Sequence, residues 1–545
     1  MNSYRSSTES RFDVVVIGGG HNGLTCACYL AQAGLSVGVF ERRGVLGGAA
    51  VTEEFHPGFR NSTASYTVSL LNPKVIRDLR LAEHGLEVLE RPLQNFLPLP
   101  DGRALTAGPD SARTHAAVRE FSPRDADRLP AYYAMLDAAV ELLRAQLLET
   151  PPADPRRLRD IWSALQLGRH FRKLAAPVQR DIHELFTRSA GDLLDHWFET
   201  DAVKALFGFD AVVGNFASPY TPGSGYVLLH HVFGEVNGKA GVWGHAVGGM
   251  GAITQAMAAE ARRLGVHLET DAPVKRIVTQ GTRATGIELE DGRVIEGRTF
   301  AANLGPKPLY LKLLADAELP TEFRARIERL RVGSATFRMN VALSALPKFT
   351  AAPRDDNGAH LGSGIILAPS LGYMDRAFAE ARIDGMSRRP IVEMLIPSTL
   401  DDSLAPKGAH VASLFCQHFS YNLPDGRDWR QEKTRAIDLI FDVIEEYAPN
   451  FRSLVVAHSA LSPLDLEEKL GLAGGDIFHG ALGLDQLWAA RPMLGYGDYR
   501  TPLKNLYLCG SGAHPGGGVT GIPGHNAARE ILRDGLSTPV SRPNS

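Results

Sequence analysis

Residues Phe12–Ala31 read FDVVVIGGGHNGLTCACYLA, and this stretch decides the fold. Its first six residues are mostly apolar and β-branched, which is typical of a buried parallel strand. The strand runs into glycines at positions 18, 20 and 23, and a helical pattern follows from Leu24 to Ala33, closed by Gly34. The order of strand, glycine-rich turn and helix predicts an α/β fold with a Rossmann-type nucleotide-binding domain.

Each glycine of the G-x-G-x-x-G turn has a mechanical reason. Gly18 permits the tight turn, Gly20 lets the backbone approach a pyrophosphate, and Gly23 lets the helix pack closely on the strand. A second strand, Ser36–Phe40, ends at Glu41, where a carboxylate can bind ribose hydroxyls. The alternative is a glycine-rich turn that binds no ligand. Such a turn would not need an acid such as Glu41 at the end of the second strand, so we predict a dinucleotide site. Glu41 would repel a 2′-phosphate, which argues against NADP.

A second glycine pair, Gly47–Gly48, follows the acid, and Arg42 beside Glu41 is a further candidate for a cofactor contact. The glycine turn followed by a glycine doublet resembles FAD enzymes of the amine oxidase and carotenoid desaturase superfamily. In those families the doublet lets the backbone pass close to the cofactor. Many members have an arginine after the doublet, whereas Ala49 stands here, so we assign no arginine phosphate contact at this position. The resemblance implies FAD as the cofactor.

The end of the chain supplies a second glycine-rich junction. Asn505–Cys509 reads NLYLC, a buried strand, and the residues after it read GSGAHPGGGVTGIPGHNAARE. Amides of this loop are expected to contact the ribityl chain and phosphates, and the helix after Pro523 can direct its positive end at the flavin. The candidate cofactor contacts in the loop are Gly510, Gly512, Gly518 and Val519. No second complete G-x-G-x-x-G turn of this type is present, so we expect no separate NAD(P)H domain.

The middle of the chain contains a helix, Ala252–Leu264, followed by short strands on either side of an Asp291-Gly292 turn. Four strands are expected: Pro273–Val278, Ala284–Leu289, Arg293–Ile295 and Thr299–Asn303. The resemblance implies that Val274 reaches the adenine through its backbone; plain sheet packing is the alternative. The FAD-binding domain is therefore predicted to be discontinuous, comprising 1–80, 240–305 and 490–545. A mixed α+β substrate domain with a helical insertion comprises 81–239 and 306–489.

The resemblance spans nearly the whole chain and points to the carotenoid desaturase and isomerase branch, including phytoene desaturase-like proteins. The stretches that carry it, besides the start of the chain, are GGDIFHGALGLDQLW and YRTPLKNLYLCGSGAHPGGGVTGIPGHNAA. It implies a large apolar substrate, and we expect hydride transfer from a C–C or C–N single bond to flavin N5, with oxygen or a quinone as the electron acceptor. A cis–trans isomerase that uses FAD and a non-catalytic, flavin-stabilised regulatory protein remain as alternatives.

Two aromatic-rich stretches adjoin cofactor segments in sequence, Tyr220–His245 and Phe478–Tyr496. We therefore expect them to meet at an apolar pocket on the flavin face, between the two domains. The candidate lining and catalytic residues are Trp243, His245, His479 and His514. For His514, a loop histidine bonded to the backbone is the alternative interpretation.

Composition excludes several other functions. Of 545 residues, 58 are Lys or Arg and 61 are Asp or Glu, and the net charge of −3 argues against nucleic-acid binding. The four cysteines include no Cys-x-x-Cys, so we expect neither a dithiol at that spacing nor a cysteine zinc site, and no metal-ligand signature occurs. Cys26 and Cys28 lie two apart on the first helix and are expected to be packing residues.

Surface and location are less constrained by the sequence. Residues 156–173 combine arginines and a lysine with apolar residues, which predicts a basic amphipathic helix. Such a helix fits contact with an anionic membrane or an ordinary solvated face. Met1–Arg11 and Leu536–Ser545 are expected to be tails, and Met1–Arg11 lacks the apolar run of a secretory signal. We expect a protein of the cytoplasm, or one peripheral to a membrane, with the mitochondrial matrix left open. The sequence does not indicate an oligomeric state.

Overall fold

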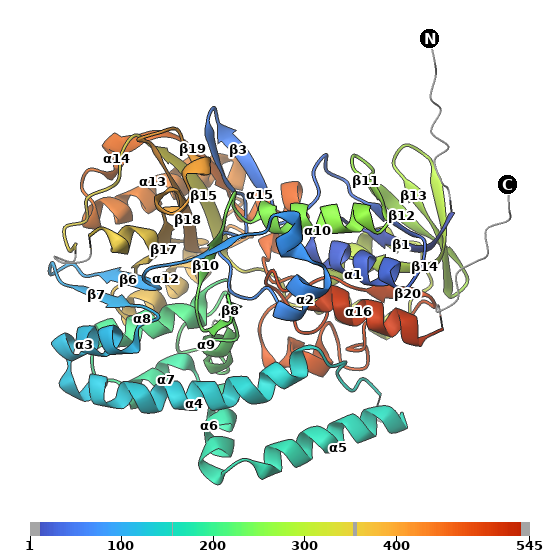
Figure 1. The fold of residues 1–545 in the computed structure, drawn as a ribbon, viewed down its shortest axis with the longest axis horizontal. Helices are drawn as coiled ribbons and strands as arrows, with labels where there is room; N and C mark the ends of the chain where they lie inside the picture. Colours follow the sequence, from blue (N-terminus) through green and yellow to red (C-terminus); the bar gives the residue numbers. More distant parts are fainter. Residues whose placement is uncertain (1–10, 155, 231, 353–356, 536–545) are drawn as a thin grey trace.

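The computed structural model describes residues 11–154, 156–230, 232–352 and 357–535. The two expected tails therefore lie outside the described residues, except for Arg11, which begins the first strand. Within the described residues the chain forms two seven-stranded sheets, each covered by helices, and a group of helices below them (Figure 1). The strands of the first sheet come from residues 11–40, 267–302 and 506–508. The domain boundaries stay a prediction.

The first sheet is the nucleotide-binding sheet. Its strand order is β11-β2-β1-β14-β13-β12, with β20 also beside β14. Ile17 of β1 pairs with Phe40 of β2 on one side and with Ala302 of β14 on the other, so these parallel strands end level. Because the strand order reverses at β1, the loops that follow β1 and its neighbours open a crevice at this edge. The bounds are β1 (Arg11–Ile17), β2 (Val37–Phe40), β11 (His267–Glu269), β12 (Val274–Gln280), β13 (Arg283–Leu289), β14 (Val294–Ala302) and β20 (Leu506–Leu508).

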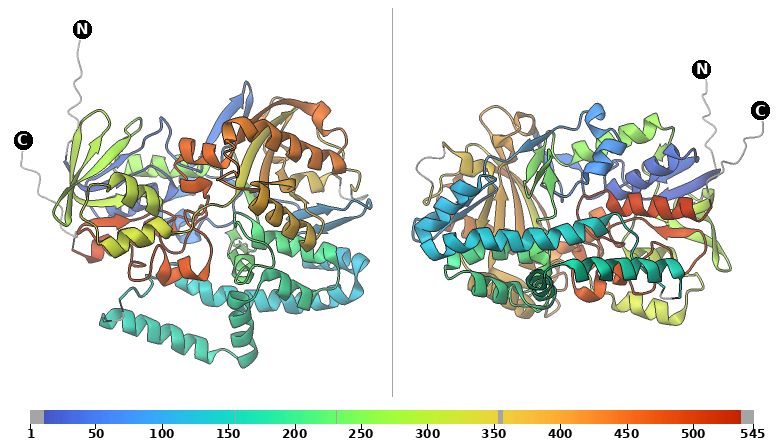
Figure 2. Two further views of the ribbon diagram at one scale, coloured as in Figure 1. Left: turned by 180° about the vertical axis from the view of Figure 1, so that it is seen from behind. Right: turned by 60° about the horizontal axis from the view of Figure 1, so that its bottom comes forward.

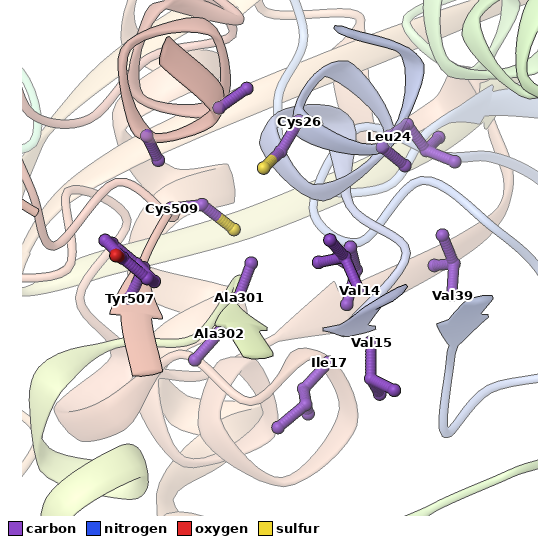
Figure 3. Close-up of a cluster of buried hydrophobic side chains, with 14 of the residues drawn as sticks. Val14, Val15, Ile17, Leu24, Cys26, Val39, Ala301, Ala302, Tyr507 and Cys509 are labelled. Carbon is purple, nitrogen blue, oxygen red and sulfur yellow. The ribbon is translucent and has the colours of Figure 1, made fainter. Parts of the chain in front are cut away.

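Three helices pack together on this sheet. Helix α1 (His21–Gln32) contacts α10 (Gly251–Arg263) and α16 (Ile522–Arg533). Figure 3 shows the core between them and the sheet, where side chains of β1, α1 and the end of β20 meet. Cys26 and Cys28 are fully buried in this cluster, which confirms them as packing residues. The fold class expected from the glycine turn is therefore confirmed.

Helix α1 and strand β14 differ from the predicted elements. Helix α1 begins at His21 rather than Leu24, because Gly20 has extended backbone and already acts as the N-cap. The two strands expected at Arg293–Ile295 and Thr299–Asn303 are one continuous strand, β14. Its first residues pair antiparallel with β13 and its last pair parallel with β1 and β20. The polar residues inside β14 hid this continuity from a reading by hydrophobic pattern.

The second sheet belongs to the inserted segments, and its order is β19-β15-β18-β17-β16-β6-β7. Successive side chains alternate between its faces: Ile365 packs against α13, whereas Ile366 packs on the opposite face with α12 and the helical group. Its strands are β6 (Asn95–Pro98), β7 (Ala104–Ala107), β15 (Thr336–Leu343), β16 (Gly364–Leu367), β17 (Met386–Leu395), β18 (His410–Phe419) and β19 (Val455–Leu461). Its covering helices are α12 (Leu371–Asp384) and α13 (Trp429–Tyr447).

The helical group between β7 and β10 confirms the expected helical insertion. It contains α3 (Ser111–Phe121), α4 (Pro123–Leu147), α5 (Leu158–Lys173), α6 (Ala176–Thr187), α7 (Ala190–Trp197), α8 (Asp201–Val212) and α9 (Gly225–His230). Helix α5 stands apart from the rest of the group in Figure 1 and in the left view of Figure 2. None of the helices in the described part of the chain is long and apolar enough to cross a membrane.

Shorter elements connect these layers. The small helices are α2 (Pro73–Asp78), α11 (Thr321–Arg329), α14 (Phe451–Leu454) and α15 (Pro463–Leu470). Three two-stranded ribbons pair β3 (Thr52–His56) with β4 (Phe59–Ser62), β5 (Val88–Glu90) with β10 (Gly244–Ala246), and β8 (Glu235–Val236) with β9 (Lys239–Ala240). The β5–β10 ribbon links the segment before the helical group to the segment that enters α10.

Candidate active site

The amino-terminal glycine turn, Gly18–Gly23, has no room for a side chain at its glycine positions. Gly18 has a φ of +96°, and a Cβ on Gly23 would lie 2.2 Å from the carbonyl oxygen of Gly18. A Cβ on Gly20 would lie 2.8 Å from Nδ2 of Asn303, at the end of β14. Gly20 caps α1 without a side-chain hydrogen bond, so the first amides of α1 are available to a ligand. Backbone amides at a helix start are suited to bind phosphate.

The glycine doublet lies directly against this turn. The amide of Gly47 donates to the carbonyl of Gly19 at 2.9 Å. A Cβ on Gly48 would approach Cα of Gly20 to 3.2 Å, and one on Gly47 would meet Oγ1 of Thr254 at 2.6 Å. The doublet and the turn therefore form one surface of bare backbone, as the close passage of a cofactor requires.

The acid after β2 is held in place by backbone amides. Oε2 of Glu41 accepts a hydrogen bond from Gly19 at 2.8 Å, and Oε1 accepts one from Arg43 at 3.0 Å. Its carbonyl accepts from Ala272 at 2.9 Å, so the strand that begins at Val274 enters beside it. Each carboxylate oxygen keeps a free lone pair for a ribose hydroxyl. The Arg42 side chain instead lies on the surface, where its guanidinium donates to the carbonyl of Glu468.

The carboxy-terminal glycine loop, Gly510–Gly521, covers the amino-terminal turn. Nε2 of His21 lies 3.1 Å from the carbonyl oxygen of Gly518, and Nδ2 of Asn22 donates to Oγ of Ser511 at 3.1 Å. A Cβ on Gly512 would collide with Pro306 at 2.5 Å. Among the described residues, Oδ1 of Asn22 is buried without a hydrogen-bond partner, which leaves an acceptor for a ligand. Gly510 lies against Asn303 in the same group.

A cavity of about 940 Å³, including its open mouth, adjoins both glycine segments. Its lining is mainly aliphatic and aromatic, with neutral polar groups at intervals. The apolar lining residues are Ala49, Ala64, Val68, Leu70, Val213, Trp243, Met250, Phe415, Leu472, Ile477, Phe478 and Val519. The polar ones are His21, Ser65, Tyr66, Thr67, Ser69, His479 and Ser511, with Gly518 completing the wall.

The four candidates of the sequence analysis separate into two pairs. Trp243 and His479 line the cavity. Burial, with Arg491 and His21 nearby, lowers the pKa of His479 to about 4, so its imidazole is neutral near pH 7. Its Nδ1 is buried and has no hydrogen-bond partner within the described chain.

His245 and His514 are not among the residues that line the cavity. Nε2 of His245 pairs with Oδ2 of Asp401 at 3.0 Å, and both side chains are buried. Nε2 of His514 bonds to the carbonyl oxygen of Gln146 at 3.1 Å, at the end of α4. The backbone-bonded role considered for His514 is thus the one that the structure gives, and His245 has a buried hydrogen-bond partner, Asp401, that the sequence did not reveal.

The two aromatic-rich stretches do meet. Trp243 of the first and Phe478 and His479 of the second share the cavity. Other members of the two stretches, Tyr226, Phe233 and Leu482, line a second cavity of about 710 Å³. Ser69 and Leu70 line both cavities, so the two adjoin at these residues.

A buried ionic group backs the cavity wall, and the sequence analysis missed it. Oη of Tyr66 donates to Oε2 of Glu393 at 2.5 Å, and the guanidinium of Arg338 lies 4.5 Å from the Tyr66 ring centre. The guanidinium of Arg91 lies 5.9 Å from the ring of Trp243 and donates to Thr67. Burial raises the pKa of Glu393 despite the two arginines. These residues come from distant segments, and hydrophobic periodicity carries no signal for such a group.

Arg491 and Asp476, which the sequence analysis also missed, fix the loop that carries His479. The Arg491 guanidinium donates to the carbonyls of Phe478, Gln486 and Ser511, and burial lowers its pKa to about 10. The Asp476 carboxylate accepts from the amides of Gly333, Phe478 and Gly480. The pair ties this loop to the carboxy-terminal glycine loop, so His479 is held on a rigid support.

These features fit FAD. The bare backbone of the glycine turn and the free amides at the start of α1 suit the pyrophosphate, and Glu41 suits a ribose. The glycine loop that covers the turn leads to an apolar cavity, which suits the isoalloxazine and a substrate. The chain belongs to the flavin-containing amine oxidoreductase family, whose model matches residues 23–372. It is therefore an FAD-dependent oxidoreductase.

Relatives with known names are similar in sequence to this protein over nearly the whole chain. Pyridine nucleotide-disulfide oxidoreductase domain-containing protein 2 of Rattus norvegicus is 42% identical over 96% of this chain and 94% of its own length. A limonene dehydrogenase component of Castellaniella defragrans is 25% identical over 97% and 96%, and phytoene desaturase (lycopene-forming) of Pantoea ananas is 27% identical over 93% and 96%. The expected family resemblance is confirmed, with phytoene desaturases as more distant relatives.

A solved structure shows the same fold. Cyclohexylamine oxidase from Brevibacterium oxydans superimposes with a TM-score of 0.56 at 16% identity, covering 96% of this chain and 99% of its own. At this level of sequence identity the match shows only that the two proteins share a fold. All four cysteines are buried and free of disulfide bonds, and the thiols of Cys26 and Cys509 lie beside each other in the core of the nucleotide-binding sheet (Figure 3).

Proposed function

We propose that this protein dehydrogenates a large apolar substrate, removing a hydride from a C–C or C–N single bond held in the cavity beside the flavin. The observation that carries the proposal is the lining of that cavity, which is mainly aliphatic and aromatic and adjoins both glycine segments. An apolar lining binds an apolar substrate by excluding water, and water exclusion also protects a hydride in transfer. When bound, FAD supplies the hydride acceptor at N5.

The residues of the chain position the substrate rather than react with it. Trp243 and Phe415 offer flat faces for a conjugated or cyclic substrate, and Ser69 and Leu70 also line the second cavity, which adjoins this one. Arg91 and the Tyr66–Glu393 pair support these faces from behind. The neutral imidazole of His479 contributes a polar contact in a mainly apolar wall.

The names of two relatives support this substrate class. Limonene dehydrogenase and phytoene desaturase are both named for taking hydrogen from a hydrocarbon. Oxygen or a quinone is the proposed electron acceptor, since the sequence has one complete dinucleotide turn, which FAD would occupy.

Anaerobic mixing tests the proposal. FAD-loaded protein is mixed with candidate apolar donors, and the oxidised flavin absorbance is followed. Bleaching by a terpene or polyene donor, followed by recovery with oxygen or a soluble quinone, supports the proposal and identifies the acceptor. Conversion between isomers on reduced protein without net bleaching would indicate an isomerase. Oxidised flavin that persists with every donor would favour a non-catalytic role.

A further inference from the structure

Helix α5 is the least buried helix of its length in the described chain. Asp160 is its one buried side chain, and it accepts hydrogen bonds from the amides of Ala153 and Asp154 just before the helix. Ion pairs fix this end of the helix to the nucleotide-binding side of the molecule, from Arg157 to Asp498 at 2.8 Å and from Arg159 to Glu530 at 3.3 Å. Figure 1 and the left view of Figure 2 show the rest of α5 running below α4, apart from the other helices, until it joins α6.

The outer face of α5 is apolar along its first two turns. Leu158, Ile161, Trp162 and Leu165 follow helical spacing, so they lie on one face. Their exposed fractions are 85%, 41%, 54% and 51%. Scattered exposed apolar residues are normal, but a contiguous set that includes a tryptophan marks an interaction site. The inner face holds Asp160 and the partly buried Leu167 and Phe171, so the outer stripe is free of the protein.

The same face becomes basic along its last two turns. Arg169, Arg172 and Lys173 continue the stripe at helical spacing. The guanidinium of Arg169 lies 5.6 Å from the ring of Trp162, which joins the apolar half to the basic half. Within the described residues these three cations form no ion pair. Residues 154–173 contain six cationic side chains and two carboxylates, so this segment is basic in a chain whose net charge is −3.

We propose that the outer stripe of α5 docks on an anionic lipid surface. Charge complementarity selects this occupant, because cations in line with an apolar stripe can reach lipid phosphates while the apolar side chains enter the acyl boundary. A tryptophan suits the level of the headgroups. The sixteen-residue helix lies along the surface and does not cross it. This inference is independent of the substrate of the flavin site.

Vesicle flotation of the full-length, FAD-loaded protein tests the proposal. Vesicles of phosphatidylcholine alone are compared with vesicles that also contain about one third phosphatidylglycerol, at low and high salt. We expect flotation with the anionic vesicles, weaker flotation as salt rises, and little with phosphatidylcholine alone.

Two variants separate the apolar and basic contributions. Ile161→Ser with Trp162→Ser and Leu165→Ser should abolish flotation, and Ile383→Ser, at a site 74% exposed on α12, is the control. Arg172→Glu with Lys173→Glu should weaken binding to anionic vesicles roughly thirtyfold or more, since each cation contributes about a fivefold factor. Arg326→Glu with Arg329→Glu on α11 is the charge-matched control. Retained FAD confirms that each variant is folded.

Three results would overturn the proposal. One is the absence of flotation with anionic vesicles at low salt. Another is flotation that the stripe variants leave unchanged. The third is a dimer on size exclusion that the serine variant converts to a monomer, because this face would then bind a second copy of the chain.

Discussion

The carboxylate of Glu41 accepts a hydrogen bond from the backbone amide of Gly19, with 2.8 Å between Oε2 and nitrogen. The contact joins the end of β2 to the middle of the amino-terminal glycine turn. We infer that Glu41 has two roles: it orders the turn that is expected to surround the phosphates, and its remaining lone pairs are available to a ribose. On this inference the two glycine segments and the acid act together in binding FAD.

Replacing Glu41 with Ala should weaken FAD binding roughly 10- to 150-fold. The reason is the loss of hydrogen bonds to a charged acceptor, which contribute about 1.5–3 kcal/mol. Titration of apoprotein with FAD, followed by quenching of flavin fluorescence, measures the change. Glu296→Ala, at an exposed site on β14, is the control and should bind FAD normally. Equal dissociation constants for the two variants would show that Glu41 is not a ribose ligand.

Replacing Gly23 with Ala should prevent close packing of α1 on β1. The added Cβ would lie 2.2 Å from the carbonyl oxygen of Gly18, and backbone cannot move aside as a flexible side chain does. We expect a loss of on the order of 3 kcal/mol in the free energy of unfolding and poor retention of FAD. Denaturant unfolding and the flavin-to-protein absorbance ratio measure both effects.

The control for that variant is Gly168→Ala, which has open space around its Cβ position in the middle of α5. Alanine is the better helix former, so this variant should be as stable as the parent or slightly more stable. Parental stability and FAD content in Gly23→Ala would contradict the packing argument.

The nucleotide-binding half of the fold was predictable because its signals are local. The turn glycines, the strand before them and Glu41 lie within thirty consecutive residues, and each has a fixed mechanical role. The cavity was predictable only as a meeting of two aromatic-rich stretches. Which side chains line it depends on tertiary contacts, so the sequence placed His245 and His479 together although the structure separates them.

The buried side-chain hydrogen bonds between distant segments were not predictable from the sequence. Asp401 lies 156 residues from His245, and Glu393 lies 327 residues from Tyr66. Pairing over such distances is decided by which strands become neighbours, and neither periodicity nor a turn motif reports it. The same holds for Asn303, whose short side chain fills the space between both glycine segments.

Replacing Asp401 with Asn should destabilise the protein rather than impair its chemistry. The Asp401 carboxylate accepts from His245, from the Gly248 amide at 2.7 Å and from Ser403, and these contacts hold its pKa far below the usual range. Losing the charge should cost about 1–3 kcal/mol. Asp402→Asn, on the exposed neighbouring residue, should have little effect. Unfolding by denaturant at pH 7 compares them, and equal midpoints would contradict the structural role.

The stability contribution of Asp401 also has a defined pH dependence. Because its pKa is lowered in the folded state, the contribution is complete above the pKa of about 4 of a free aspartate and is lost as the pH falls below it. The difference in unfolding free energy between parent and Asp401→Asn should therefore shrink below about pH 4.

His418 should make the protein sensitive to mild acid. Burial lowers the pKa of His418 to about 3, whereas an unfolded histidine has a pKa near 6.5. Below about pH 6.5 the unfolded chain therefore takes up a proton that the folded protein does not, and stability falls as the pH falls. His418→Phe, which suits the neighbouring rings of Phe216 and Phe378, removes this effect.

The unfolding free energy of His418→Phe relative to the parent should rise by about 2 kcal/mol between about pH 7.5 and pH 5.0. Denaturant unfolding at the two pH values measures it. His183→Phe, at an exposed site on α6, controls for the loss of an imidazole as such. A constant difference between His418→Phe and the parent would refute the proton linkage.

His479 and His514 form a matched pair that tests where the chemistry lies. Burial lowers the pKa of each to about 4, so both are neutral at pH 7 and differ in position. Nδ1 of each is buried without a hydrogen-bond partner among the described residues, but His479 lines the cavity, whereas Nε2 of His514 is bonded to the carbonyl of Gln146 away from the lining. His479→Asn should slow flavin reduction by an apolar donor about ten- to a hundredfold, because a poorly positioned substrate reacts more slowly, and FAD affinity should remain.

The corresponding change at His514 should act on stability. His514→Asn should leave flavin reduction within a few-fold of the parent and lower the free energy of unfolding by about 1–3 kcal/mol, since the hydrogen bond of the buried imidazole to the Gln146 carbonyl is lost. Rapid-mixing measurement of flavin bleaching and denaturant unfolding are done on both variants. If His514→Asn slows bleaching while His479→Asn does not, the cavity beside His479 is not where the substrate reacts, because the residue that faces the reacting bond must affect the rate most.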